Sequence, residues 1–539
     1  MKPAPAIIST TEGGTPRTMS WPELRAASAA FAAALRAAGI GPGDRVAAYL
    51  PNVPEAIVAV LGTASVGAVW SSCSPDFGVQ GVLDRFGQIG PRLFIAADSY
   101  AYGGKTFDQR AKIAGVLKQL PSVEQAVIGA EGWEAFIGPH RGAAPSYDRL
   151  PFNHPLYILY SSGTTGVPKC IVHGAGGTLL QHLKEQQLHA DLKPRDRLFF
   201  FTTCGWMMWN WLASALATET TILLYDGSPL HPGPDVLWDM AADEGVTVFG
   251  TSPKYLATLE KAGYRPRERH ALVVLRTILS TGSPLAPEQY DFVAGAIGAD
   301  VQLASISGGT DIVSCFALGN PLLPVYRGEL QCRGLGMRVE VWDQSGRPVT
   351  GEKGELVCTA PFPSMPIGFW NDADGSRYRA AYFERYPGVW HHGDYASLTP
   401  RGGLVILGRS DAVLNPGGVR IGTAEIYRQV EQLDEVLESV VVGQDVGSDV
   451  RVVLFVRLRD GLALDEALRD RIRRQIRANT TPRHVPAVIV QVPEIPRTLS
   501  GKIVELAVRE TIHGRPVRNT DALANPASLE HFRDRPELR

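Results

Sequence analysis

The chain has few cysteines, no excess of charge of either sign and no long apolar run, and each absence excludes a class of protein. Its 539 residues include six cysteines, none of them in a Cys-x-x-Cys pair. We therefore expect reduced thiols in a cytoplasmic protein, without a disulfide framework or a structural zinc site. Lys and Arg total 53 against 55 Asp and Glu, a net charge of −2. This balance predicts neither a nucleic-acid partner nor a polybasic membrane contact.

The most apolar stretch is too short to cross a membrane. It runs from Ala56 to Trp70 and includes two glycines, whereas a membrane-spanning helix needs about 20 apolar residues. The first ten residues also lack the apolar segment of a signal peptide. We interpret residues 56–70 as a buried helix that runs into a strand, and we expect no membrane partner.

What the chain does have is a regular alternation of strand and helix patterns. Ser20-Trp21-Pro22-Glu23 is a capping box with proline in the first turn, so we expect a helix there that stops at Gly39. Further apolar segments predict strands and helices at 45–50, 79–89, 93–97, 125–128, 156–160, 246–250, 254 onward and 275–280. This alternation is typical of α/β layers with largely parallel sheets.

The pattern changes after about residue 330. Residues 338–342 and 354–359 alternate as strands around the turn signal at 343–346, which predicts a β-rich subdomain. An α+β piece with helix and strand patterns follows residue 411. The predicted divisions are a large N-terminal domain at 1–408, its β-rich subdomain at about 330–408, a hinge at 409–411 and a small mobile C-terminal domain at 412–539.

The stretch around which the chain is organised is a loop rich in glycine and hydroxyl residues. It reads Y-S-S-G-T-T-G-V-P-K from Tyr160 to Lys169, after a buried strand. Glycines let consecutive N–H groups turn toward one anion, while hydroxyls add donors and lysine adds charge. The spacing is not that of a Walker A loop. We expect phosphate binding at Ser161, Ser162, Gly163, Thr164, Thr165, Gly166 and Lys169. For such a loop taken alone, an ordinary polar loop is the alternative.

This loop resembles the phosphate loop of the adenylate-forming superfamily, which includes acyl-CoA synthetases, adenylation domains and luciferases. Four further motifs follow in the order of that family, at residues 305–311, 390–395, 408–421 and 496–503. The resemblance therefore covers nearly the whole chain. It implies that ATP activates a carboxylic acid as an acyl adenylate.

The resemblance also implies roles for individual residues. Thr310 and Asp311 would contact the α-phosphate and Mg²⁺, an ion that prefers oxygen ligands. Asp394 would accept hydrogen bonds from the ribose, and Lys502 would be the catalytic lysine of adenylation. The other assignments are nucleotide contacts at Gly282, Ser283, Pro284, Gly309, Arg409 and Arg420, the pivot of the hinge at Asp411 and the passage of CoA past Gly418.

Residues 73–78, 205–210 and 514–523 resemble those of acetoacetyl-CoA synthetases. The related acetyl-CoA synthetases carry a tryptophan two residues before the motif threonine, where this chain has Gly308. We expect the glycine to leave room for a longer acid beside Trp206 and Met207. A hydrophobic pocket separates acids by only about 1–3 kcal/mol per methylene, so the residue that reads the keto group stays unassigned.

The sequence thus predicts a ligase that makes acetoacetyl-CoA from acetoacetate, ATP and CoA through acetoacetyl-AMP, with Mg²⁺ as cofactor. These small molecules are the expected partners, and the sequence leaves both a monomer and a homodimer open. One alternative is a synthetase for another short or medium-chain acid. Another is an adenylate-binding protein that does not turn over, because only nineteen residues precede Ser20, fewer than these relatives usually carry.

Overall fold

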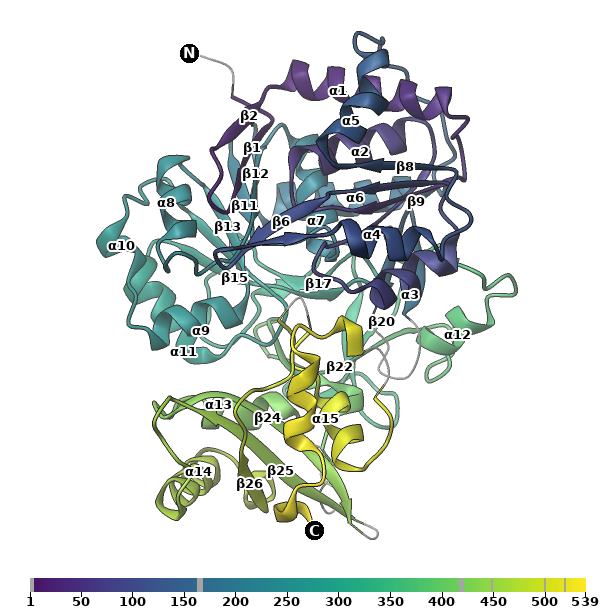
Figure 1. The fold of residues 1–539 in the computed structure, drawn as a ribbon. Coiled ribbons are helices and arrows are strands. Elements are labelled where there is room, and N and C mark those ends of the chain that lie inside the picture. Colours follow the sequence, from purple (N-terminus) through teal and green to yellow (C-terminus); the bar gives the residue numbers. More distant parts are fainter. Residues whose placement is uncertain are drawn as a thin grey trace.

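The computed structural model describes residues 4–161, 168–414, 416, 421–446, 449–498, 501–517 and 520–539. These residues form a large N-terminal domain and a small C-terminal domain, with the C-terminal domain below the other in Figure 1. Mixed α/β layers build both. The predicted fold class is confirmed.

Two seven-stranded sheets form the body of the large domain. In the first the strand order is β15-β14-β13-β11-β12-β1-β2. Its strands are β1 (Ile7–Thr11), β2 (Arg17–Met19), β11 (Arg197–Phe200), β12 (Thr221–Asp226), β13 (Val248–Thr251), β14 (Thr277–Ser280) and β15 (Gln302–Ser305). All neighbours pair in parallel except β1 and β2. The sequence patterns did not indicate β1, whose partner β12 lies more than two hundred residues along the chain.

The second sheet has the order β21-β10-β9-β4-β3-β5-β8. Its strands are β3 (Arg45–Tyr49), β4 (Val69–Cys73), β5 (Leu93–Ala96), β8 (Gln125–Ile128), β9 (Pro155–Ser161), β10 (Lys169–Gly174) and β21 (Gly368–Phe369). Strands β9 and β10 are antiparallel and stand on either side of the glycine-rich loop. Lys169 begins β10 and lies opposite Ser161, the last residue of β9.

Helices cover both sheets in the α/β manner (Figure 1). They are α1 (Trp21–Ala37), α2 (Pro54–Ser65), α3 (Val79–Ile89), α4 (Arg110–Leu117), α5 (Gly129–Ile137), α6 (Ala175–Lys184), α7 (Met207–Ser214), α8 (Val236–Asp243), α9 (Pro253–Lys261), α10 (Pro266–Arg269), α11 (Pro287–Phe292) and α12 (Ser376–Tyr382). The predicted capping box is present: Ser20 Oγ accepts from Glu23 N, and Glu23 accepts from Ser20 N. A short hairpin joins β6 (Ser99–Tyr102) to β7 (Lys105–Asp108).

Two smaller sheets lie in the chain between the seven-stranded sheets and the small domain. Strands β16 (Ser307–Gly309), β17 (Ser314–Leu318) and β18 (Cys332–Arg333) form one of them. Strands β19 (Val339–Trp342), β20 (Lys353–Cys358), β22 (Trp390–Leu398) and β23 (Leu404–Arg409) form the other. The four-stranded sheet confirms the β-rich character expected after residue 330, and its last strand ends at Arg409.

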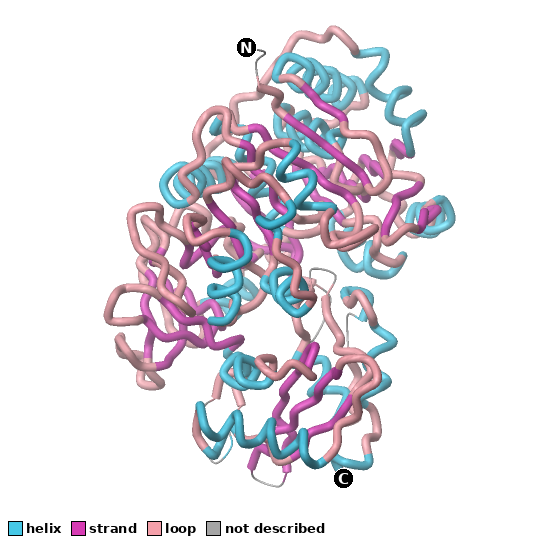
Figure 2. Tube along the Cα trace, turned by 90° about the vertical axis from the view of Figure 1, so that its left-hand side faces the viewer, coloured by secondary structure: helices cyan, strands magenta, loops and turns pink. Residues whose placement is uncertain are grey.

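The small domain is one sheet with helices on both faces, as Figure 2 shows. Strands β24 (Val436–Val446), β25 (Asp449–Leu458) and β26 (Val488–Gln491) alternate side chains between two cores. Val441 packs with helices α13 (Thr423–Val430) and α14 (Glu466–Asn479), whereas Val440 faces α15 (Glu505–Ile512).

None of the helices in the described part of the chain combines the length and the apolar character needed to cross a membrane. All six cysteines are free, and five are buried.

Candidate active site

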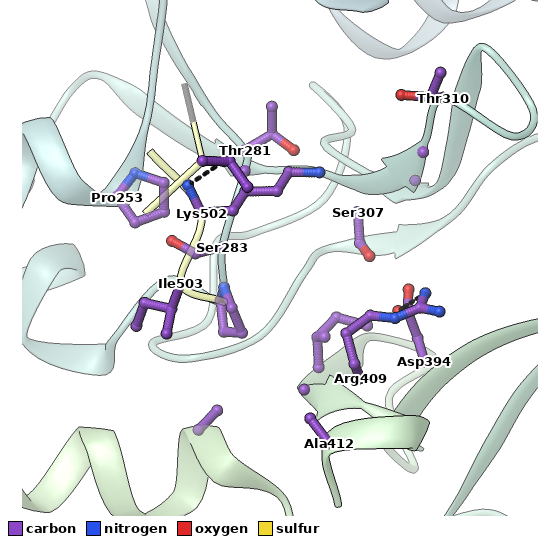
Figure 3. A pocket seen from close by; sticks show the side chains of 18 of the residues that line it. Pro253, Thr281, Ser283, Ser307, Thr310, Asp394, Arg409, Ala412, Lys502 and Ile503 are labelled. Atoms are coloured by element: carbon purple, nitrogen blue, oxygen red, sulfur yellow. Dashed lines mark hydrogen bonds and ion pairs between the residues drawn. The ribbon is translucent and has the colours of Figure 1, made fainter. Parts of the chain in front are cut away.

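A cavity of about 830 Å³ lies between the two domains. The large domain lines it with residues around β16, β17, β22 and β23 and with the loop at 281–286. The small domain contributes residues 497–498 and 502–506. Figure 3 shows side chains from both domains directed into this space. Most of the residues predicted from the motifs meet here, although they are spread over more than three hundred positions.

Asp311 is held by partners from two distant segments. Lys169 Nζ lies 2.6 Å from Asp311 Oδ1, and the Tyr382 hydroxyl donates to the same oxygen. Burial opposes ionisation of Asp311, but the Lys169 ammonium, with its hydrogen bond, outweighs it and holds the pKa of Asp311 well below the usual range. The carboxylate is therefore charged at neutral pH, as a ligand of a cation or a partner of phosphate-binding lysine must be.

Tyr382 is a site residue that sequence reasoning missed. It ends α12, eight residues before the motif at 390–395 and outside it, and its ring stacks on Trp390 with centroids 3.9 Å apart. Burial, and then the charge of Asp311, raise the pKa of its hydroxyl, so the tyrosine stays a neutral donor. Nothing in its local spacing marks it, because its role depends on where α12 packs.

Asp394 and Arg409 form a second pair, on neighbouring strands β22 and β23. Arg409 Nη1 lies 3.0 Å from Asp394 Oδ1 and also donates to the His392 carbonyl at 3.2 Å. Burial lowers the pKa of His392, which leaves its ring neutral between Phe316 and Asp394. Figure 3 shows the side chains of Arg409 and Asp394 next to each other in the cavity lining. A buried carboxylate with one arginine retains lone pairs for further donors, such as hydroxyl groups.

Lys502 reaches this cavity from the small domain. In Figure 3 its side chain extends across the space toward the side occupied by Thr310. Its backbone N–H donates to Thr498 Oγ1 at 3.0 Å, which fixes the start of the side chain. The surrounding protein and then the positive charge of Arg409 lower the pKa of Lys502. The two domains thus place two cations, Lys502 and Arg409, close to each other in the cavity, an arrangement that favours an anion between them.

The loop at 281–286 and the predicted acyl residues also line the cavity. Gly282 has φ of +111°, which favours glycine, and Trp206 Cζ2 would lie 3.8 Å from a Cβ placed there. Gly282, Ser283, Pro284, Trp206 and Met207 all line the cavity.

Gly308 also lines the cavity, but backbone atoms occupy the space that a side chain at this position would enter. A Cβ at this position would lie 2.0 Å from the Ser314 carbonyl oxygen and 2.6 Å from Cys315 Cα. The register between β16 and β17 shifts at this point, and the two backbones approach closely. The expected room beside Gly308 is therefore absent in this conformation: the backbone of β17 fills it, so the glycine permits strand packing there.

The remaining predictions fall into two groups. Ser161, Gly309, Thr310 and Asp411 line the same cavity, and Arg409 Nε lies 3.6 Å from Asp411 Oδ1. Outside the described residues lie Ser162, Gly163, Thr164, Thr165, Gly166, Gly418 and Arg420. A second unpredicted feature borders the predicted hinge, where buried Glu355 pairs with Arg385 at 2.8 Å and accepts from Ser410 Oγ.

The comparison with known families agrees with this geometry. The sequence profile described as AMP-binding enzyme matches residues 2–366, and the profile of its C-terminal domain matches residues 428–502. The chain belongs to the family of AMP-binding enzymes.

Among relatives of this AMP-binding enzyme, an acetoacetyl-coenzyme A synthetase from Rhizobium meliloti is 60% identical, covering 99% of this chain and 84% of that protein. An acetoacetyl-CoA synthetase from Gallus gallus is 49% identical, covering 97% and 81%. The solved acetoacetyl-CoA synthetase from Streptomyces lividans superposes with a TM-score of 0.93 at 48% identity, covering 98% and 83% of the two chains. An anthranilate CoA ligase, at 19% identity and a TM-score of 0.81, shares the fold.

Proposed function

We propose that this AMP-binding enzyme joins acetoacetate to CoA, using ATP and releasing AMP and pyrophosphate. The observation that carries the proposal is the near full-length identity of 47–60% to proteins named acetoacetyl-CoA synthetase. The acid first attacks the α-phosphate of ATP, which gives acetoacetyl-AMP and pyrophosphate. The CoA thiol then attacks the acyl carbon and displaces AMP.

The cavity contains suitable residues for the first step. Asp394 would accept hydrogen bonds from the ribose hydroxyls, and Arg409 would face the phosphate. Lys502 would lie beside the acid's carboxylate and the α-phosphate, two negative groups that must approach each other. A cation held there stabilises the charge that develops in the transition state.

The residues also suit a magnesium ion. Mg²⁺ usually retains waters and binds through phosphates and one or two protein carboxylates. Among the described residues no cluster of three metal ligands exists, but the ionised carboxylate of Asp311 meets this smaller requirement, with Thr310 next to it. When bound, the ion would neutralise phosphate charge. Lys169, now paired with Asp311, would then be available to a phosphate oxygen.

The second step requires Lys502 to leave. We propose that the small domain, residues 412–539, turns about Asp411 and carries Lys502 out of the cavity before the thiol attacks. The short 3₁₀ turn at Ser410–Ala412 connects the last strand of the large domain to the small domain. Gly418 and Arg420 would belong to the CoA and phosphate contacts. Free cysteines fit a reducing compartment, so we propose a cytoplasmic location.

The decisive experiment measures CoA-dependent AMP formation with acetoacetate, acetate and butyrate side by side. Acetoacetate should be the preferred acid. Preference for butyrate would indicate a synthetase for another short acid, and ATP binding without AMP formation from any acid would indicate a protein that does not turn over.

Malonamate belongs in the same assay for a specific reason. A protein named malonamoyl-CoA synthetase, from Penicillium aethiopicum, is 42% identical over 98% of this chain. Malonamate and acetoacetate differ only by an amino group in place of a methyl group. A preference for malonamate would transfer the proposal to the amide acid.

A further inference from the structure

Helix α9 of the large domain makes direct polar contacts with the small domain. In Figure 1 this helix lies just above α13 and β24. Lys261, at its C-terminal end, donates from Nζ to the Leu437 carbonyl at 2.9 Å and to the Val436 carbonyl. Lys254, near its N-terminal end, forms an ion pair with Glu438. Both lysines reach the first residues of β24, so α9 holds the small domain along one strand.

Glu438 is a buried carboxylate that forms ion pairs with three basic side chains. Its side chain is 6% exposed, and among the described residues Lys254 is its one ion-pair partner from the large domain. The others are Arg457, at 3.3 Å, and Arg497, at 3.2 Å, both from the small domain. A buried carboxylate needs such partners because burial without them is costly.

Arg497 connects this carboxylate to the segment that carries the lysine of adenylation. Its Nε bonds Glu438, while its Nη1 donates to the carbonyl of Gly501 at 2.7 Å. Gly501 directly precedes Lys502, and Arg497 also forms a β-bridge with Ile503. One arginine therefore links Glu438 to both sides of Lys502. The polar chain runs from α9, through Glu438 and Arg497, to the backbone of the lysine.

We propose that Lys254 and Glu438 are positioning residues that dock the Lys502 segment against the large domain for adenylation. The inference rests on the proposed function, because it assigns the docked arrangement to the first of the two steps. Rotation of the small domain separates Lys254 from Glu438, while Glu438 keeps both arginines. The contact therefore favours the first half-reaction and takes no part in the second.

The charges indicate which partner to change. Removal of Glu438 would leave three cations without their shared carboxylate and would disturb the small domain itself. Removal of Lys254 takes away one of the contacts between the domains and leaves both arginines on Glu438. Burial and then Arg497 lower the pKa of Lys254 to about 7, so its charge near neutral pH depends on neighbouring carboxylates. Arginine keeps its charge in such surroundings, which makes Lys254→Arg the conservative variant.

Lys353→Met provides a matched control. Lys353 also pairs across the two domains, with Glu425 on α13, and its side chain is 42% exposed against 37% for Lys254. Within the described part of the chain, Glu425 accepts from Gly422 N and pairs with His484, and it makes no bond to Arg497 or Gly501. The two substitutions thus remove similar ion pairs between the domains. Only the Lys254–Glu438 pair is connected, through Arg497, to the backbone around Lys502.

Both half-reactions are measured on each variant: acetoacetate-dependent pyrophosphate release, and thioester formation from supplied acetoacetyl-AMP and CoA. Lys254→Met should slow pyrophosphate release about fivefold, as expected for a partly exposed ion pair, and should leave thioester formation within about twofold. Lys254→Arg should restore the first step, and Lys353→Met should stay close to the parent enzyme. Equal loss in Lys254→Met and Lys353→Met, or equal loss of both steps in Lys254→Met, would overturn the proposal.

Hydrogen–deuterium exchange without nucleotide gives a readout that does not need turnover. Peptides that contain Lys502 or the start of β24 should exchange faster in Lys254→Met than in the parent, Lys254→Arg and Lys353→Met proteins. Unchanged exchange of these peptides would overturn the docking role. If the parent enzyme releases no pyrophosphate with acetoacetate, the proposed function fails, and the exchange result alone decides the role of Lys254.

Discussion

Replacement of Gly308 by alanine tests whether this residue shapes the cavity through space or through strand packing. The added Cβ would lie 2.0 Å from the Ser314 carbonyl oxygen and 2.8 Å from its carbon. No side-chain rotation relieves this overlap, because the atoms it meets are backbone. Strands β16 and β17 must separate, and β16 leads directly into Thr310 and Asp311. We therefore expect both stability and adenylation to fall.

The size of the effect follows from the overlap. Overpacking of a dense region costs about 1–3 kcal/mol, and contact with backbone places this variant at the upper end, about 2–3 kcal/mol. The entropy of unfolding is about 2.1 cal/mol/K per residue, so for a cooperative unit of roughly 400 residues this cost lowers Tm by about 2–4 °C. Tryptophan at the same position should cost more, and should not simply shift preference toward acetate.

The assay is differential scanning calorimetry of Gly308→Ala beside Gly368→Ala. A Cβ at Gly368 meets no atom within 4 Å, and its φ is not in the left-handed region, so alanine there should leave Tm unchanged or raise it slightly. Pyrophosphate release is measured on the same preparations. Equal Tm values for the two variants, with Gly308→Ala fully active, would refute the packing argument and restore Gly308 as an open pocket wall.

Three further predictions concern catalysis and pH. Lys502→Ala should nearly abolish acetoacetate-dependent pyrophosphate release and spare thioester formation from supplied acetoacetyl-AMP; comparable collapse of both steps would contradict its role. Asp411→Pro should spare adenylation and slow thioester formation, since proline fixes φ near −65°; equal loss of both would place the pivot elsewhere. Burial raises the pKa of Asp226 from 3.8 to about 6, so its stabilising contribution is complete below pH 3.8 and is lost as pH rises through 6. The free energy of unfolding in urea, measured for Asp226→Asn and for the parent, should therefore shift in favour of Asp226→Asn from pH 4 to pH 7. The same difference between the two proteins at both pH values would refute this.

The sequence by itself determined the local structure and the class of chemistry. The capping box at Ser20 sets the start of α1 because its hydrogen bonds join residues three apart. Helix α3 and strand β8 lie at the predicted residues, since their apolar periods need no distant partner. The ordered motifs identified the family, because each motif is a short string. The roles that the resemblance implies for single residues stay proposals.

Tertiary structure alone decided which of these residues touch and what they can do there. Lys169 meets Asp311 across 142 positions, and Tyr382 reaches the same carboxylate from a helix that no motif marked. The sequence predicted free space beside Gly308, but the register of β16 against β17 places backbone atoms there. Lys254 finds Glu438 only because the small domain lies against α9. Such contacts depend on strand register and domain orientation, which sum many weak interactions over the whole chain and leave no pattern in the residues around any one of them.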